Sequence, residues 1–185
     1  MGTTRRALLI ALPFAAASAL ARPADAASAS KINREADAAL RKLYDTEAKA
    51  RELSRSARAI LIFPKIIKAG LVVGGQSGDG VLRVGGKTSG YYNISAASYG
   101  LQAGVQTFSY ALFFMTESAL DYLNKSDGWQ IGTGPSVVLV DKGIARGLTS
   151  TTVTQDVYSF AFGQRGLMAG LGLEGSKITR IRPGR

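Results

Sequence analysis

The sequence predicts an α+β fold, in which one or more N-terminal amphipathic helices pack with a curved, glycine-rich antiparallel β-sheet or barrel-like meander. Two observations support this prediction. Residues 30–59 are rich in Ala, Leu, Glu, Lys and Arg, which favour helices, and residues 27–69 contain no glycine. Residues 70–184 contain 21 of the 22 glycines, which separate short apolar runs of strand length. The chain of 185 residues shows no linker and no internal repeat, so we expect one domain.

Residues 27–56 are the predicted helical segment. Ser30 is a suitable N-cap for it. Apolar residues then recur at roughly helical spacing, namely Ile32, Ala36, Leu40, Leu43, Ala50, Leu53 and Ala57. Charged residues occupy the other face. We therefore expect one long amphipathic helix, or two with a break near Ser54.

Residues 57–185 are the predicted β-rich domain, with a short basic C-terminal tail. The expected strands are residues 60–63, 71–73, 81–84, 91–94, 99–108, 110–115, 137–140, 157–162, 167–173 and 178–181. A helix over residues 117–123, capped by Thr116, is expected to interrupt the sheet.

Glycine and proline predict where these strands bend or end. We expect Pro64 to stop the first strand. Gly74-Gly75 and Gly85-Gly86 are expected to form bulges or sharp bends. The acidic segments at residues 77–80 and 141–143 are interpreted as turns rather than as paired acids or calcium ligands.

Residues 1–26 resemble a secretory signal peptide. Arg5 and Arg6 precede an apolar run over residues 7–20, and small residues suggest cleavage after Ala26. Residues 4–9 also match part of the twin-arginine export pattern. The sequence is therefore consistent with export by the twin-arginine route or by the general secretory route. No cysteine follows the apolar run, so we do not expect a lipoprotein. We expect an exported, periplasmic protein.

The composition argues against catalysis. Lys and Arg number 23 and Asp and Glu 13, so the net charge is +10, but the chain has no histidine and no cysteine. These absences remove the commonest general base, thiolate nucleophiles and thiolate metal sites. We expect no enzymatic activity, no metal and no cofactor.

One sequence motif imitates a nucleotide site. Residues 170–175 read G-x-G-x-x-G, but a dinucleotide site needs a following helix and a further βα unit, and only ten residues remain. Glycines that let strands approach each other explain this segment better. Nucleic acid is not an expected partner either, because the chain has no nucleic-acid-binding motif and carries an export signal.

The positive charge is concentrated in two segments. Residues 55–68 and residues 177–185 each contain four basic residues and no acidic residue. Basic residues beside aliphatic ones favour an anionic bilayer, by about 1 kcal/mol for each cation near the surface. The alternative is that residues 60–63 are a core strand with solvated lysines beside them.

From about residue 57 to residue 181 the chain closely resembles the SYLF domain, also called the yeast-type actin-binding domain. The matching blocks are residues 59–65, 68–70, 84–92, 99–106, 114–116 and 166–177. The resemblance implies binding of phosphoinositides or other acidic phospholipids, and of actin in some members. It also implies that the lipid contacts lie in the N-terminal basic region, here near residues 55–68.

We therefore predict that an exported SYLF-type protein binds anionic phospholipid at the cell envelope. The predicted lipid-binding residues are Arg55, Arg58, Lys65, Ile66, Ile67, Lys68, Lys177, Arg180 and Arg182, with Ile66 and Ile67 entering the bilayer interface. This prediction requires the two basic segments to share a face. The alternative is a structural or protein-interaction module of the periplasm without lipid affinity, docking an envelope protein. We do not expect actin as a partner, because a periplasm contains none.

Overall fold

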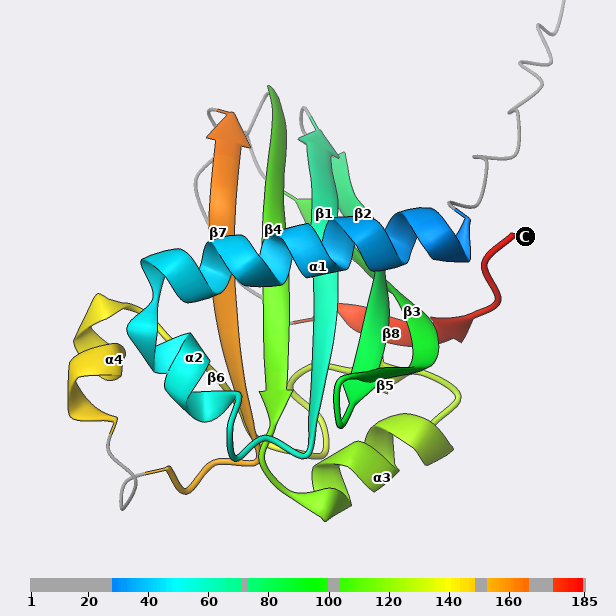
Figure 1. The fold of residues 1–185 in the computed structure, drawn as a ribbon. Helices are drawn as coiled ribbons and strands as arrows, with labels where there is room; N and C mark the ends of the chain where they lie inside the picture. Colours follow the sequence, from blue (N-terminus) through cyan, green and yellow to red (C-terminus); the bar gives the residue numbers. More distant parts are fainter. Residues whose placement is uncertain (1–27, 71–72, 100–103, 149–152, 167–174, 185) are drawn as a thin grey trace, which may run out of the picture.

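The computed structural model describes residues 28–70, 73–99, 104–148, 153–166 and 175–184. The proposed signal peptide and the strand expected at residues 167–173 lie outside the described residues. The elements in chain order are α1 (Ala29–Thr46), α2 (Ala48–Leu53), β1 (Ala59–Gly70), β2 (Val73–Val84), β3 (Lys87–Tyr99), β4 (Gly104–Phe114), α3 (Glu117–Lys125), β5 (Trp129–Gln130), β6 (Val137–Leu139), α4 (Lys142–Gly147), β7 (Val157–Gly166) and β8 (Lys177–Ile181) (Figure 1).

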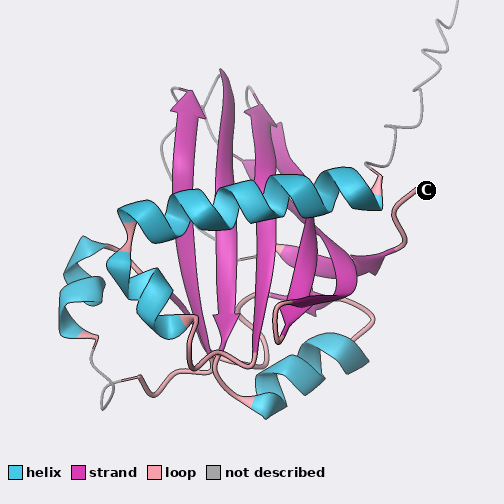
Figure 2. Cartoon of the chain, in the orientation of Figure 1, coloured by secondary structure: helices cyan, strands magenta, loops and turns pink. Residues whose placement is uncertain are grey.

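The strands form one curved eight-stranded sheet, which confirms the predicted α+β class (Figure 2). Their order is β5-β8-β3-β2-β1-β4-β7-β6, so β1 lies near the centre and chain-distant β3 and β8 are neighbours. Every pair is antiparallel except β6 and β7, which run parallel. The purely antiparallel prediction is therefore wrong at this edge, where α4 lies in the connection between the two parallel strands.

β1 continues through Pro64, so the prediction that this proline ends the strand is wrong. The pairing of β1 with β4 shifts register between Phe63 and Ile66, which places the proline in a bulge. Proline has no N–H to donate, and a bulge is one of the few places where a sheet interior tolerates it. Ser109 Oγ donates to the Pro64 carbonyl oxygen over 2.7 Å and so satisfies that acceptor at the irregularity.

The two glycine pairs differ from each other. Gly85 and Gly86 have φ of 55° and 78° and form the two-residue turn between β2 and β3, where left-handed backbone is required. Gly74 and Gly75 instead lie in β2 and pair regularly with β1 and β3, so the predicted bulge there is wrong. Residues 77–80 also belong to β2 and not to a turn.

The helices differ from the prediction at their ends. Ser28, not Ser30, caps α1, and its side chain accepts a hydrogen bond from the backbone N–H of Lys31. The helical segment is interrupted at Glu47 rather than near Ser54, which instead follows the end of α2. Thr116 caps α3 as predicted, accepting from the N–H of Ala119.

Residues 142–147 form α4, so the turn expected at residues 141–143 is wrong. The Asp141 carboxylate accepts a hydrogen bond from the Ile144 N–H over 2.8 Å at the start of this helix.

The sheet has two faces with separate cores. α1 crosses one face, which we call the α1 face, and its Ile32 and Ala36 pack against Ile62 of β1 and Val81 of β2 (Figure 1). α2 and the last turns of α1 extend this contact over β4 and β7. The opposite face holds the largest apolar cluster, which α3 and Trp129 close at one end. No described helix is both long and apolar enough to span a membrane.

Candidate functional site

The predicted site residues separate into three groups, because alternate residues of a strand point to opposite faces. Arg55 and Arg58 lie just before β1, in an exposed position beside α1 and α2. Arg58 Nε is 3.5 Å from the Glu117 carboxylate at the start of α3. These two arginines are therefore at one end of β1, roughly 30 Å along the strand from Lys68.

A second group belongs to the opposite face. Ile66 is fully buried in the large apolar cluster, so the prediction that it enters a bilayer interface is wrong. Lys68 follows it by two residues and lies on the same side of β1. In β8, the Arg180 guanidinium is 6.0 Å from the ring centre of Tyr92, a residue of that cluster. It also donates to the Ser89 carbonyl oxygen over 3.4 Å. The requirement that all nine residues share one face is therefore not met.

The third group shares the α1 face. Ile67 of β1 lies opposite Ser77 of β2, Ser77 lies opposite Ser95 of β3, and Ser95 lies opposite Lys177 of β8. Directly opposed residues of paired strands project to the same side. Ile67 and Lys177 are therefore the two ends of one cross-strand row, and both are exposed. Pairing thus brings parts of the two basic segments onto one face.

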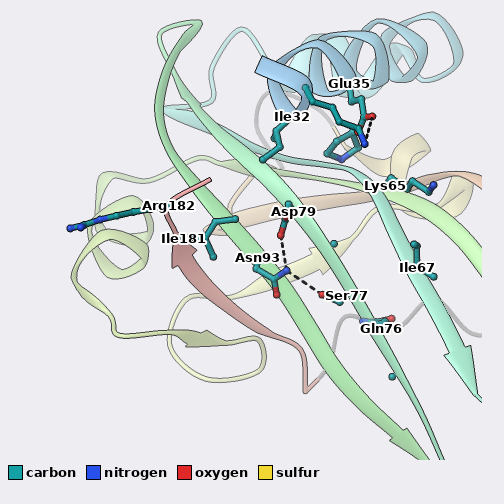
Figure 3. A pocket seen from close by; sticks show the side chains of 14 residues that line it. Ile32, Glu35, Lys65, Ile67, Gln76, Ser77, Asp79, Asn93, Ile181 and Arg182 are labelled. Carbon is teal, nitrogen blue, oxygen red and sulfur yellow. Dashed lines mark hydrogen bonds and ion pairs between the residues drawn. The ribbon is translucent and has the colours of Figure 1, made fainter. Parts of the chain in front are cut away.

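An open groove lies beside this row, between the first turns of α1 and the strands. Its volume is about 970 Å³, and it is lined by Lys31, Ile32, Glu35, Pro64, Lys65, Ile67, Gly75, Gln76, Ser77, Gly78, Asp79, Asn93, Ile181 and Arg182. Lys65 of β1 and Arg182, which follows β8, lie on opposite sides of this groove, and the Arg182 side chain extends outward from it (Figure 3).

The groove contains a small polar network. The Asn93 side-chain amide donates to the Asp79 carboxylate over 2.8 Å and to Ser77 Oγ over 3.1 Å (Figure 3). Lys31 and Glu35 face each other on α1 at 4.0 Å. The groove therefore combines internally paired polar groups with the basic side chains of Lys65 and Arg182. Such an arrangement can hold an anionic group at its edge.

No three His, Cys, Asp or Glu residues in the described part of the chain gather as metal ligands. Burial raises the pKa of Tyr92, an effect that Arg180 partly offsets, and burial also raises the pKa of Tyr110. Both tyrosines belong to the apolar cluster on the opposite face, away from the groove.

Sequence reasoning missed Arg165 of β7. Ile67 lies opposite Thr107 of β4, and Thr107 lies opposite Arg165. The row that runs from Lys177 to Ile67 therefore continues past Ile67 to this exposed arginine. It stands alone in a nearly neutral stretch of sequence, and no charge count could select it. The sheet register alone places it in the row of Ile67, with Thr107 of β4 between them.

Comparison with protein families identifies the segment that follows β2. Residues 95–182 match the sequence model of the family described as Ysc84, Las17-binding protein actin regulator, which is the SYLF family. This match confirms the predicted SYLF resemblance over residues 95–182. The matched segment runs from the second half of β3 past β8 and includes Lys177, Arg180 and Arg182, whereas residues 55–68 precede it. No curated protein matches the chain.

Proposed function

We propose that this SYLF domain binds an anionic phospholipid surface through the α1 face of its sheet. The observation that carries the proposal is the cross-strand row, which joins Ile67 to Lys177 and Arg165 although these residues are far apart in the chain. Lys65 lies next to the row at the bulge of β1. The footprint consists of Lys65, Ile67, Arg165, Lys177 and Arg182.

The expected strength follows from the charges. Each cation held near an anionic surface contributes about 1 kcal/mol, so the four cations of the footprint increase binding by roughly three orders of magnitude. Because these charges are exposed, salt screens their attraction over a distance of about 8–10 Å. The binding we propose is therefore strong only where anionic lipid is abundant and ionic strength is moderate.

The proposed location is the cell envelope. Residues 1–26 have the pattern of a secretory signal peptide, which would deliver the domain to the periplasm. The proposed role there is binding rather than catalysis, because the chain has neither histidine nor cysteine. Phosphatidylglycerol and cardiolipin are the anionic lipids that we expect such a domain to contact.

A protein partner is the second candidate. The family description names Las17 binding and actin regulation, which are interactions with proteins. A periplasmic domain would need a different partner, docked on the same sheet face, with the charge serving solubility. A partner that the domain retains at high salt, together with no affinity for vesicles, would favour this alternative.

Co-sedimentation with vesicles tests the proposal. We expect the mature chain, residues 27–185, to sediment with vesicles containing phosphatidylglycerol or cardiolipin far more than with pure phosphatidylcholine vesicles, and the difference to shrink in 0.5–1 M salt. Residues 1–26 are left out of the tested protein, because their apolar run and their Arg5, Arg6 and Arg22 would themselves favour anionic vesicles. Equal sedimentation with both kinds of vesicle at moderate salt would reject the proposal.

A further inference from the structure

Three exposed aliphatic residues gather at one end of the sheet. Ile67, Val73 and Val105 are 45%, 59% and 61% exposed. Ile67 is close to the end of β1, Val73 begins β2, and Val105 is the second residue of β4. All three therefore belong to the strand ends farthest from α3.

The sheet register places these side chains on one face. Val105 lies opposite Ala69 of β1, Ala69 lies opposite Gly75 of β2, and Gly75 lies opposite Ala97 of β3. Ile67 is two residues before Ala69 in β1, and Val73 is two residues before Gly75 in β2. Residues two apart in a strand point to the same side, so both share the face of this row. We call the set Ile67, Ala69, Val73, Ala97 and Val105 the strand-end patch.

The strand-end patch is on the α1 face but beyond α1. The helix packs on Ile62 and Val81, which are lower on the same strands. Figure 1 shows the ends of β1, β4 and β7 continuing past the helix. All five patch residues are exposed, so no described element covers them.

Basic residues flank the strand-end patch, and the nearest acids on this face, Glu35 and Asp79, lie in the groove toward α1. Arg165 of β7 and Lys177 of β8 are at the two ends of the adjoining row. Residues 66–70, 73–78, 94–99 and 104–109 contain no acidic residue. At the other end of the same strands, Arg83 pairs with Asp37 at 2.7 Å and Arg58 with Glu117 at 3.5 Å. At that other end the cations thus lie beside acidic residues, whereas Arg165 and Lys177 flank exposed aliphatic side chains.

This combination indicates one kind of partner. An apolar centre between cations fits a bilayer interface, where aliphatic side chains leave water and basic ones meet lipid phosphates. We propose that the strand-end patch enters the interfacial layer of an anionic bilayer, so that the ends of β1, β2 and β4 farthest from α3 face the membrane. This inference rests on the proposed function and specifies how the domain is oriented on the lipid.

Site-specific labelling tests the orientation. The chain has no cysteine, so Val73→Cys gives a single attachment point for an environment-sensitive fluorophore. Val84→Cys is a matched control, because Val84 is the last residue of the same strand, is 37% exposed and is roughly 35 Å away. With phosphatidylglycerol vesicles, we expect the label at residue 73 to shift to shorter wavelength and to be quenched by brominated lipid. The label at residue 84 should do neither.

The two proposals fail in different ways. If the labelled proteins sediment with anionic vesicles but the label at residue 73 stays in water, the orientation is wrong and lipid binding stands. If neither protein sediments with the vesicles, both proposals are wrong. Protection of residue 73 by a periplasmic protein in the absence of lipid would also overturn the orientation.

A substitution gives an independent measurement. Exchange of both Val73 and Val105 for Asn should weaken binding to anionic vesicles about threefold to tenfold, because both side chains leave the interface. Val84→Asn should leave binding unchanged. Far-ultraviolet circular dichroism checks that each variant is folded. Equal binding of the double variant and the unchanged protein would contradict the inference.

Discussion

Asp156 is a residue whose several contacts join three elements. Its carboxylate accepts from the N–H and Oγ of Ser136 at 3.0 Å and from Thr116 Oγ1 at 3.1 Å. Its backbone carbonyl accepts from the N–H of Met115 over 2.8 Å. These bonds connect the start of β7 with β6, the end of β4 and the cap of α3. The hydrogen bonds from Ser136 hold the pKa of Asp156 below its ordinary 3.8.

Asp156→Asn should therefore destabilise the fold in a pH-dependent way. A depressed pKa means that the carboxylate stabilises the native state above its ordinary pKa, and that this contribution is lost as the pH falls through the native value. We expect a loss of about 1 kcal/mol at pH 7 that diminishes toward pH 3, measured by urea unfolding across that range. Asp127→Asn is the control, because Asp127 is exposed, and it should change stability by less than about 0.5 kcal/mol. A pH-independent loss would contradict the assignment.

At the scale of elements, β2 shows why its glycines are not interchangeable. A Cβ at Gly80 would be 2.5 Å from Cδ1 of Phe63, which is buried in the apolar cluster. At Gly75 of the same strand, the nearest atom to an added Cβ is 3.4 Å away. Gly80 therefore lets β2 approach β1 closely where the sheet curves, whereas Gly75 does not have this role.

Gly80→Ala should accordingly cost about 1–3 kcal/mol, because neither the Phe63 ring nor the backbone of β1 can move easily. Gly75→Ala in the same strand should be nearly neutral. Chemical denaturation of the two variants measures the difference. Similar stability of both would show that the sheet is not tightly packed at Gly80.

The start of α1 provides a second comparison between near neighbours. Ser28 Oγ accepts from the Lys31 N–H, and the hydroxyl of Ser30 is 3.2 Å from Ser28 Oγ. Ser28→Ala should cost about 1 kcal/mol, as loss of an N-cap does, and Ser30→Ala clearly less. Thermal unfolding of the two variants decides which serine is the cap. A larger loss for Ser30→Ala would contradict the observed helix start.

The elements also show what sequence patterns can and cannot predict. Apolar spacing and local capping predicted the Thr116 cap and the strand-length runs, because these depend on residues close together in the chain. Pro64 was misread because its effect depends on a bulge against β4, which only the pairing of distant strands creates. The crossover between β6 and β7 was missed for the same reason.

At the scale of the whole molecule, the curved sheet redistributes the two basic segments. Counting charges predicted where the cations lie in the chain but not on which face. The bulge at Pro64 changes the alternation of β1, so Ile67 is on the α1 face while Ile66 is buried in the core. Pairing then brings Lys177 and Arg165 into the row of Ile67, and leaves Arg55 and Arg58 at the other end of the strand. Four of the nine predicted residues and one unpredicted arginine make up the proposed footprint.

The most direct test of this account compares two double substitutions that each remove two positive charges. Lys65→Gln with Lys177→Gln alters the proposed footprint, and Arg55→Gln with Arg58→Gln alters the other end of β1. With phosphatidylglycerol vesicles at moderate salt, we predict that the lysine pair lowers the partition coefficient about 30-fold and the arginine pair less than threefold. Equal losses in the two proteins, or a larger loss from the arginine pair, would contradict binding through the α1 face.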